Sequence, residues 1–168
     1  MSEAISSWAD SRVEEMIRIL DIRRKARGLS FRQLVDASGV AFETLHGWRV
    51  GERSPWLGTL EAALRALGLR LMIEPDVETE TKDPVTLVIA SQDNQFWRDF
   101  KYQLLLPRLA EMGVPAYKLA PLAGLSPATI YNWERGDRAK IATLLKVLRL
   151  IGYTVTLVDE SKVSVSRQ

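Results

Sequence analysis

The sequence contains no cysteine and only one histidine, His46. Without cysteine the chain has no disulfides and no thiolate metal sites, and this composition fits a reducing compartment. A single histidine leaves little for metal binding or acid–base catalysis. No glycine-rich phosphate loop, cluster of metal ligands or nucleophile–base pair stands out either. We therefore expect no enzymatic activity and no cofactor.

Long apolar runs are also missing, so the sequence predicts no membrane-spanning segment. The first residues, Met1 to Ala4, lack the charged and then apolar pattern of a signal peptide. Hydrophobic residues make up 46% of the chain and charged residues 26%, which is typical of a soluble globular protein. A chain of 168 residues forms one ordinary domain or two small ones.

A large net charge is absent as well, because the formal net charge is only +2. The charges are unevenly distributed: residues 1–75 carry 11 basic and 10 acidic side chains, residues 76–84 carry one and four, and residues 85–168 carry 11 and seven. The second half is therefore the more basic, and acidic residues concentrate in the link between the halves. This is a modest electrostatic footprint, not that of a polybasic protein.

One short stretch in the second half has a clear helical pattern. Ser126 suits a helix N-cap, and Pro127 fits the first helical position, where its missing N–H needs no partner. Ile130 and Trp133 are three residues apart and face one side, which we expect to be the core side. Gly136 suits the left-handed position that ends a helix. The outward residues are small, hydrogen-bonding or cationic, and such a face can enter a DNA major groove: Ala128, Thr129, Tyr131, Asn132 and Arg135.

A shorter amphipathic segment, from Tyr117 to Ala123, precedes this helix, and a glycine turn connects the two. Helix, glycine turn and capped helix is the layout of a helix-turn-helix motif. Here the chain resembles the lambda-repressor-like (Cro or XRE-type) family of DNA-binding proteins. The resemblance rests on a run of spaced positions: Leu119, Ala120, Gly124, Leu125, Ser126, Thr129, Ile130, Trp133, Glu134, Arg135, Gly136, Arg138, Thr143 and Leu144.

The first half repeats this pattern. Shifting the sequence by 85 residues aligns it with itself, and the shift becomes 84 after a loop that is one residue shorter in the second copy. The aligned pairs are Gly28 with Gly113, Leu34 with Leu119, Gly39 with Gly124, Thr44 with Thr129, Leu45 with Ile130, Trp48 with Trp133, Gly51 with Gly136, Arg53 with Arg138, Thr59 with Thr143, Leu60 with Leu144, Leu64 with Leu148, Arg65 with Arg149 and Gly68 with Gly152. The sequence therefore predicts a tandem duplication of one helix-turn-helix module.

Hydrophobic periodicity predicts a mainly helical fold with a few short strands. In the first half we expect a long helix that is capped by Asp10 or Ser11 and ends near Arg27, followed by helices over residues 31–38, 42–50 and 57–67. In the second half we expect helices that begin near Asn94, Pro115, Ser126 and Ala142. Pro107 falls inside the first of these and should kink or split it.

The expected strands span residues 69–73, 85–90 and 153–158, and they pair either within the chain or across a dimer. The acidic residues 76–84 form an exposed linker or a hairpin loop between two strands. The domain boundaries follow: residues 1–75 form the first helix-turn-helix domain, and residues 85–168 form the second. We expect Trp48 and Trp133 in the core, and Trp56 between the modules or at a dimer seam.

The resemblance implies that the helix from Pro127 to Arg135 reads DNA, with its first turn and Asn132 nearest to the base edges. Asparagine can bond adenine bidentately, and alanine or threonine can contact a thymine methyl. Residues that flank the groove should contact phosphates. For all of these residues, the alternative to DNA contact is that they form an ordinary solvated surface. The candidate DNA contacts of the second half are Tyr117, Lys118, Ser126, Pro127, Ala128, Thr129, Tyr131, Asn132, Arg135, Arg138 and Lys140.

The first half departs from the family pattern. Ala41 stands where a Ser or Thr cap is usual, and Gly47 has no side chain with which to read a base, although it could permit close approach. Glu43 can accept from cytosine but repels phosphates, and Phe42 suits a wedge, a thymine-methyl contact or a protein-binding knob. The candidate DNA contacts here are Arg32, Phe42, Glu43, Thr44, His46, Arg49 and Arg53, with protein contact as the competing interpretation.

By resemblance, the sequence predicts a sequence-specific transcriptional regulator of double-stranded DNA, most often a repressor, in a bacterial or phage cytoplasm at the nucleoid. Two modules in one chain can cover two half-sites as a pseudo-dimer, or a homodimer can assemble through the strands. The alternative function is an antitoxin-like or anti-activator protein that binds a protein partner through its first domain. Salt dependence separates the two, because binding through phosphate contacts weakens steeply with salt.

Overall fold

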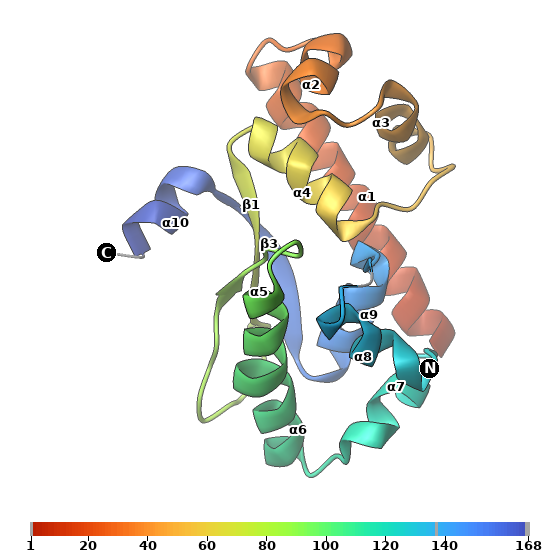
Figure 1. Ribbon diagram of the computed structural model, residues 1–168, viewed down its shortest axis with the longest axis vertical. Coiled ribbons are helices and arrows are strands. Elements are labelled where there is room, and N and C mark those ends of the chain that lie inside the picture. Colours follow the sequence, from red (N-terminus) through yellow and green to blue (C-terminus); the bar gives the residue numbers. More distant parts are fainter. Residues whose placement is uncertain (1, 137, 167–168) are drawn as a thin grey trace.

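The computed structural model describes residues 2–136 and 138–166 and has a mainly helical fold with one small sheet (Figure 1). The first half contains α1 (Ser2–Ala26), α2 (Phe31–Ser38), α3 (Phe42–Arg49), α4 (Leu57–Ala66) and β1 (Leu69–Pro75). The second half contains β2 (Leu87–Val88), α5 (Asn94–Asp99), the π-helical segment η1 (Phe100–Leu105), α6 (Leu106–Met112), the 3-10 helix η2 (Ala116–Lys118), α7 (Leu119–Leu122), α8 (Pro127–Glu134), α9 (Ile141–Leu150), β3 (Tyr153–Asp159) and α10 (Glu160–Ser166). The expected mainly helical class is confirmed. Within the described ranges, no helix combines the length and the apolar character needed to cross a lipid bilayer.

The first helix begins earlier than the sequence suggested. We expected a cap at Asp10 or Ser11, but α1 starts at Ser2. Its extra turns pack against the second half, where the Arg149 guanidinium lies 4.9 Å from the centroid of the Trp8 ring. Ala9 in these turns is fully buried. The early start follows from this long-range packing, which commonly decides helix limits over local propensity.

The three strands form one antiparallel sheet with the order β2-β1-β3, so they pair within the chain. Of the two pairings left open by the sequence, the intramolecular one is therefore realised. In the register between β1 and β3, Met72 lies opposite Thr156. An isolated antiparallel bridge joins Trp56 to Lys140. In both pairs the two residues are 84 positions apart, which is the offset of the internal repeat at this point of the chain.

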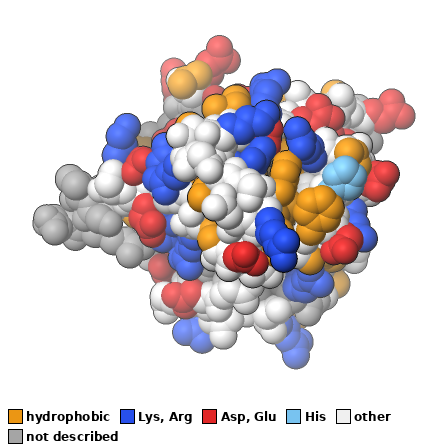
Figure 2. All heavy atoms as spheres, turned by 90° about the horizontal axis from the view of Figure 1, so that it is seen from above, with side chains coloured by type: hydrophobic (Ala, Val, Ile, Leu, Met, Phe, Trp, Pro, Cys, Tyr) orange, Lys and Arg blue, Asp and Glu red, His pale blue; other side chains and the backbone are white. Residues whose placement is uncertain are grey.

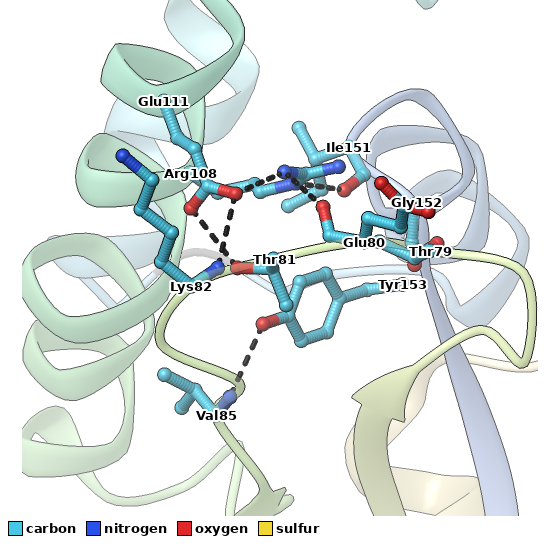
Figure 3. Close-up of polar contacts among 10 residues, drawn as sticks. All are labelled: Thr79, Glu80, Thr81, Lys82, Val85, Arg108, Glu111, Ile151, Gly152 and Tyr153. Atoms are coloured by element: carbon cyan, nitrogen blue, oxygen red, sulfur yellow. Dashed lines mark hydrogen bonds and ion pairs between the residues drawn. The ribbon is translucent and has the colours of Figure 1, made fainter.

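The acidic connection between β1 and β2 is a hairpin loop that is fixed to the second half (Figure 3). The Thr79 hydroxyl donates to the carbonyl oxygen of Gly152 at 2.6 Å, and the Thr81 hydroxyl donates to a Glu111 carboxylate oxygen at 3.0 Å. Glu111 also accepts a bond from Arg108 at 2.9 Å. The connection is therefore held by specific contacts and does not behave as a free tether between two independent parts.

The helix that contains Pro107 departs from α-geometry, as expected from the proline. The π-helical turns of η1 separate α5 from α6, and Pro107 follows near the start of α6. Proline lacks an N–H and its ring clashes with the carbonyl one turn earlier, so a wider turn before it relieves both problems. The residues around η1 thereby come to face α8.

One continuous hydrophobic core runs through both halves and includes Trp48 in the first and Trp133 in the second. Both indoles are buried, as predicted. A polar contact also crosses the junction, because Glu61 on α4 accepts from the backbone N–H of Ser91 at 3.2 Å and from the Ser91 hydroxyl. Burial raises the pKa of the Glu61 carboxyl, and the bonds from Ser91 only partly oppose this.

Candidate nucleic-acid interface

The helix α8 is built by local sequence signals and anchored by aromatic packing. The Ser126 hydroxyl accepts a bond from the backbone N–H of Ala128 at 3.3 Å, and Pro127 occupies the first turn. Trp133 points inward against Trp97, with ring centroids 5.4 Å apart. Gly136 follows the helix with a φ of 98°, the left-handed conformation that glycine tolerates best. The predicted cap, core face and stop are all confirmed.

The outward face of α8 leaves polar groups available. Thr129 and Asn132 are partly exposed, and neither side chain has a hydrogen-bond partner in the described parts of the chain. The Arg135 guanidinium lies 5.6 Å from the centroid of the Tyr131 ring, and both side chains are exposed. A helix face with unsatisfied amide and hydroxyl groups beside a cation can bond base edges and phosphates.

Cations from the segment after α8 meet the first half at a shared tryptophan. Arg138 and Lys140 lie over the Trp56 ring, 4.1 Å and 4.8 Å from its centroid. The backbone N–H of Leu57 donates to Ala139 at 2.7 Å, and the N–H of Ile141 donates to Pro55 at 3.2 Å. Trp56 therefore packs at the junction of the two halves, which was one of the two places expected for it.

A polar groove of about 450 Å³ opens at this junction. Its lining brings together residues that the sequence offered as separate phosphate contacts, Arg53 from the first half and Arg138 and Lys140 from the second. Thr44 of α3 lines the same groove, and among the described residues Glu52 is its one acidic member. The groove is thus a cationic site between α3 and the segment that follows α8. The sequence pattern did not reveal it, because the three cations come together only through the junction.

The corresponding helix of the first half, α3, is held differently. Ala41 precedes it and has no side-chain oxygen to accept a capping bond. The Phe42 ring, 52% exposed, stacks on the His46 ring at 5.8 Å and meets the edge of Phe31 at 6.3 Å. The Arg49 guanidinium lies 5.0 Å from the centroid of the Phe31 ring. Figure 2 looks onto this end of the molecule and shows an apolar patch beside the histidine, bordered by both basic and acidic side chains.

Gly47 has a packing role that the sequence did not show. A Cβ atom at this position would lie 2.8 Å from Cδ of Arg53, so the absence of a side chain lets Arg53 return across α3. The backbone N–H groups of Glu52 and Arg53 donate to the Gly47 carbonyl at 2.9 Å and 3.1 Å. We expected that Gly47 could permit the close approach of a base. In the structure Gly47 is buried, and the group that approaches it closely is the Arg53 side chain.

The remaining candidates lie on the surface without forming one cluster. Arg32 and Glu43 are exposed on α2 and α3, and Lys118 is exposed on η2. Tyr117 is 75% exposed, and its ring lies with that of Tyr131 at the open side of an apolar cavity. Beside this cavity, a hydrogen bond from Lys101 to Glu134 raises the pKa of the lysine above its usual value.

Comparison with known proteins supports the second half of this description. A family model described as helix-turn-helix matches residues 108–158, a range that runs from α6 to β3 and includes α7 and α8. No curated protein and no solved structure matches the chain. A helix-turn-helix domain is therefore present in the second half, and the match does not extend to the first.

Proposed function

We propose that the protein binds double-stranded DNA as a sequence-specific transcriptional regulator, with α8 as its principal reading helix. The observation that carries this proposal is the polar face of α8, where Thr129 and Asn132 have no side-chain hydrogen-bond partner among the described residues. The chain continues from α8 to Arg138 and Lys140, which line the cationic groove. In this arrangement Asn132 bonds an adenine, and Arg138 and Lys140 bind the flanking backbone. The family resemblance favours repression over activation.

We further propose that the chain is a tandem duplication that acts as a pseudo-dimer on DNA. The register of β1 with β3 supports this, since Met72 lies opposite Thr156, its own counterpart in the repeat. The Trp56–Lys140 bridge also joins two residues that correspond to each other in the repeat. The bond from the N–H of Leu57 to the carbonyl of Ala139 corresponds to the bond from Ile141 to Pro55, because Leu57 aligns with Ile141 and Pro55 with Ala139. Two contacts of this kind define a local two-fold axis between the halves. We expect the same axis to relate α3 to α8, as two recognition helices are related in a symmetric dimer.

The experiment that tests the proposal is selection of bound duplexes from a random library with the wild type, Asn132→Ala and Thr44→Ala. We expect a two-part motif that loses one part with Asn132→Ala and the other with Thr44→Ala. Asn94→Ala, at an exposed position of α5, is the matched control and should select the wild-type motif. If the wild type enriches no motif even at low salt, DNA binding is excluded as the function.

A second candidate function has one specific observation in its favour. The exposed Phe42–His46 stack with Val50, which is 50% exposed, gives α3 an apolar surface that suits a protein partner. On this alternative the protein is antitoxin-like or an anti-activator, and its first half binds a protein partner. When a protein neutralises Z phosphates, the logarithm of its DNA-binding constant falls against the logarithm of the salt concentration with a slope of about −0.9Z. An interface centred on Phe42 depends little on salt.

The salt dependence of DNA binding also identifies the phosphate contacts. Replacing Arg138 by alanine should reduce the salt slope of DNA binding by about one unit without changing the preferred sequence. Arg98→Ala, at an exposed position on α5 away from the groove, should leave the slope unchanged. An unchanged slope with Arg138→Ala would remove this residue from the interface.

A further inference from the structure

An apolar cavity of about 450 Å³ lies directly behind α8. Its walls come from four elements of the second half: Phe100 and Leu105 of η1, Leu109 of α6, Leu119 of α7 and Ile130 of α8. The cavity is open on one side, where Ala116 lies. Its size falls within the range of small-molecule pockets, roughly 300–1,000 Å³.

The internal repeat shows what occupies the equivalent place in the first half. At the offset of 85 residues, Ala116 corresponds to Phe31 and Pro127 corresponds to Phe42. In the first half these two rings pack edge to face at 6.3 Å, and the Arg24 guanidinium lies 4.2 Å from the Phe31 centroid. The second half has a methyl group and a proline ring at the same two positions, so the aromatic volume is missing where the cavity lies.

The lining determines the kind of molecule that fits. Aliphatic and aromatic side chains dominate it, and the charged groups Lys101 and Glu134 neutralise each other through an ion pair of 3.0 Å. The exposed rings of Tyr117 and Tyr131 flank the open side and can stack on a planar guest. Water in a predominantly apolar cavity finds few polar partners, so its replacement by an apolar guest is favourable.

We propose that this cavity binds a small, uncharged molecule with one or two aromatic rings, which occupies the place that the Phe31 ring fills in the first half. The bound molecule contacts η1 and α8 at the same time, so the site lies beside the candidate DNA interface. The proposal rests on the proposed duplication, which supplies Phe31 as the counterpart of Ala116, and it does not depend on DNA binding.

The test uses indole as the probe and the full-length protein labelled at its Leu and Ile methyl groups. Titration followed by ¹H–¹³C NMR should shift the methyl signals of Leu105, Leu109 and Ile130 in the wild type. The variant Ala116→Phe restores the ring of the first half and should abolish these shifts. Ala110→Phe is the control, because Ala110 is exposed on α6 and does not line the cavity.

A second variant keeps the proposal testable if Ala116→Phe does not fold. Pro127→Phe places the other ring of the first half at an exposed position in the first turn of α8, and it should weaken indole binding as well. Circular dichroism establishes that each variant is folded before titration. Absence of methyl shifts in the wild type, or equal shifts in a folded Ala116→Phe variant, would overturn the proposal.

Discussion

The two halves of the molecule share one sheet and one hydrophobic core, yet they build the helices α3 and α8 in different ways. In the second half, α8 has a side-chain cap and a free polar face, with a cavity behind it. In the first half, α3 follows an alanine, and aromatic rings fill the corresponding space. The comparison shows that the two helices present different surfaces, hydroxyl and amide groups on α8 and stacked aromatic rings on α3.

The largest expected effect tests whether the halves fold separately. Trp133→Ala and Trp48→Ala should each destabilise the protein by about 3–5 kcal/mol, the usual range for removal of a buried tryptophan. Because the core and the sheet continue through both halves, thermal unfolding should remain a single transition that shifts in both variants. Differential scanning calorimetry checks this. Two separate transitions, with only one of them shifted by each substitution, would show that the halves are independent.

The second-largest effect is expected from the loss of a base contact. Asn132→Ala should weaken binding to the selected duplex by about 1–3 kcal/mol, which is roughly 5- to 150-fold, if Asn132 bonds a base bidentately. His46→Ala should have a smaller effect, because the His46 ring already stacks on Phe42. Fluorescence anisotropy at one fixed salt concentration measures both. The expected contrast between α8 and α3 fails if the His46 substitution has the larger effect.

The capping difference can be reversed by exchanging two residues. Ser126→Ala removes the acceptor for the Ala128 N–H and should cost about 1 kcal/mol, whereas Ala41→Ser supplies an acceptor and should stabilise by a similar amount. Urea denaturation measures both changes. An Ala41→Ser variant that is no more stable than the wild type would mean that the first backbone N–H groups of α3 already have hydrogen-bond partners.

The smallest effect concerns pH dependence at the junction. Burial raises the pKa of Glu61 above its ordinary value near 4.5, so the folded state binds a proton more tightly than the unfolded state. The stability contributed by this group is present below pH 4.5 and falls as pH rises from there through the raised pKa. Glu61→Gln keeps an acceptor for Ser91 and should flatten this part of the curve. Glu14→Gln, at an exposed site on α1, should leave the curve unchanged when stability is measured from pH 4 to 8.

Local chemistry explains what could be predicted from the sequence. Ser126, Trp133 and Gly136 act through bonds and packing within a few residues, so their cap, core and stop roles could be recognised directly. The same holds for Pro107, whose missing N–H affects its own helix. The alternation of apolar residues located two strands near their observed limits, Leu69–Pro75 and Tyr153–Asp159. The strand expected over residues 85–90 was too long, because only Leu87–Val88 pairs with β1.

Long-range packing explains what the sequence could not supply. The start of α1 at Ser2 depends on contacts of Trp8 with the second half, and the cationic groove depends on Trp56 beneath Arg138 and Lys140. The burial of Glu61 likewise depends on its contact with Ser91 of the second half. The cavity had one signal that could have revealed it, the replacement of Phe31 by Ala116 at the repeat offset, but its meaning required the packed helices.

The most direct test of the central claim, that one chain presents two related reading helices, is native mass spectrometry of the wild type bound to its selected duplex. The account predicts one chain per duplex over a motif with two parts, and no binding of a second chain when protein is in excess. Two chains on one duplex, each requiring Asn132 and neither affected by Thr44→Ala, would contradict it and assign DNA reading to α8 alone.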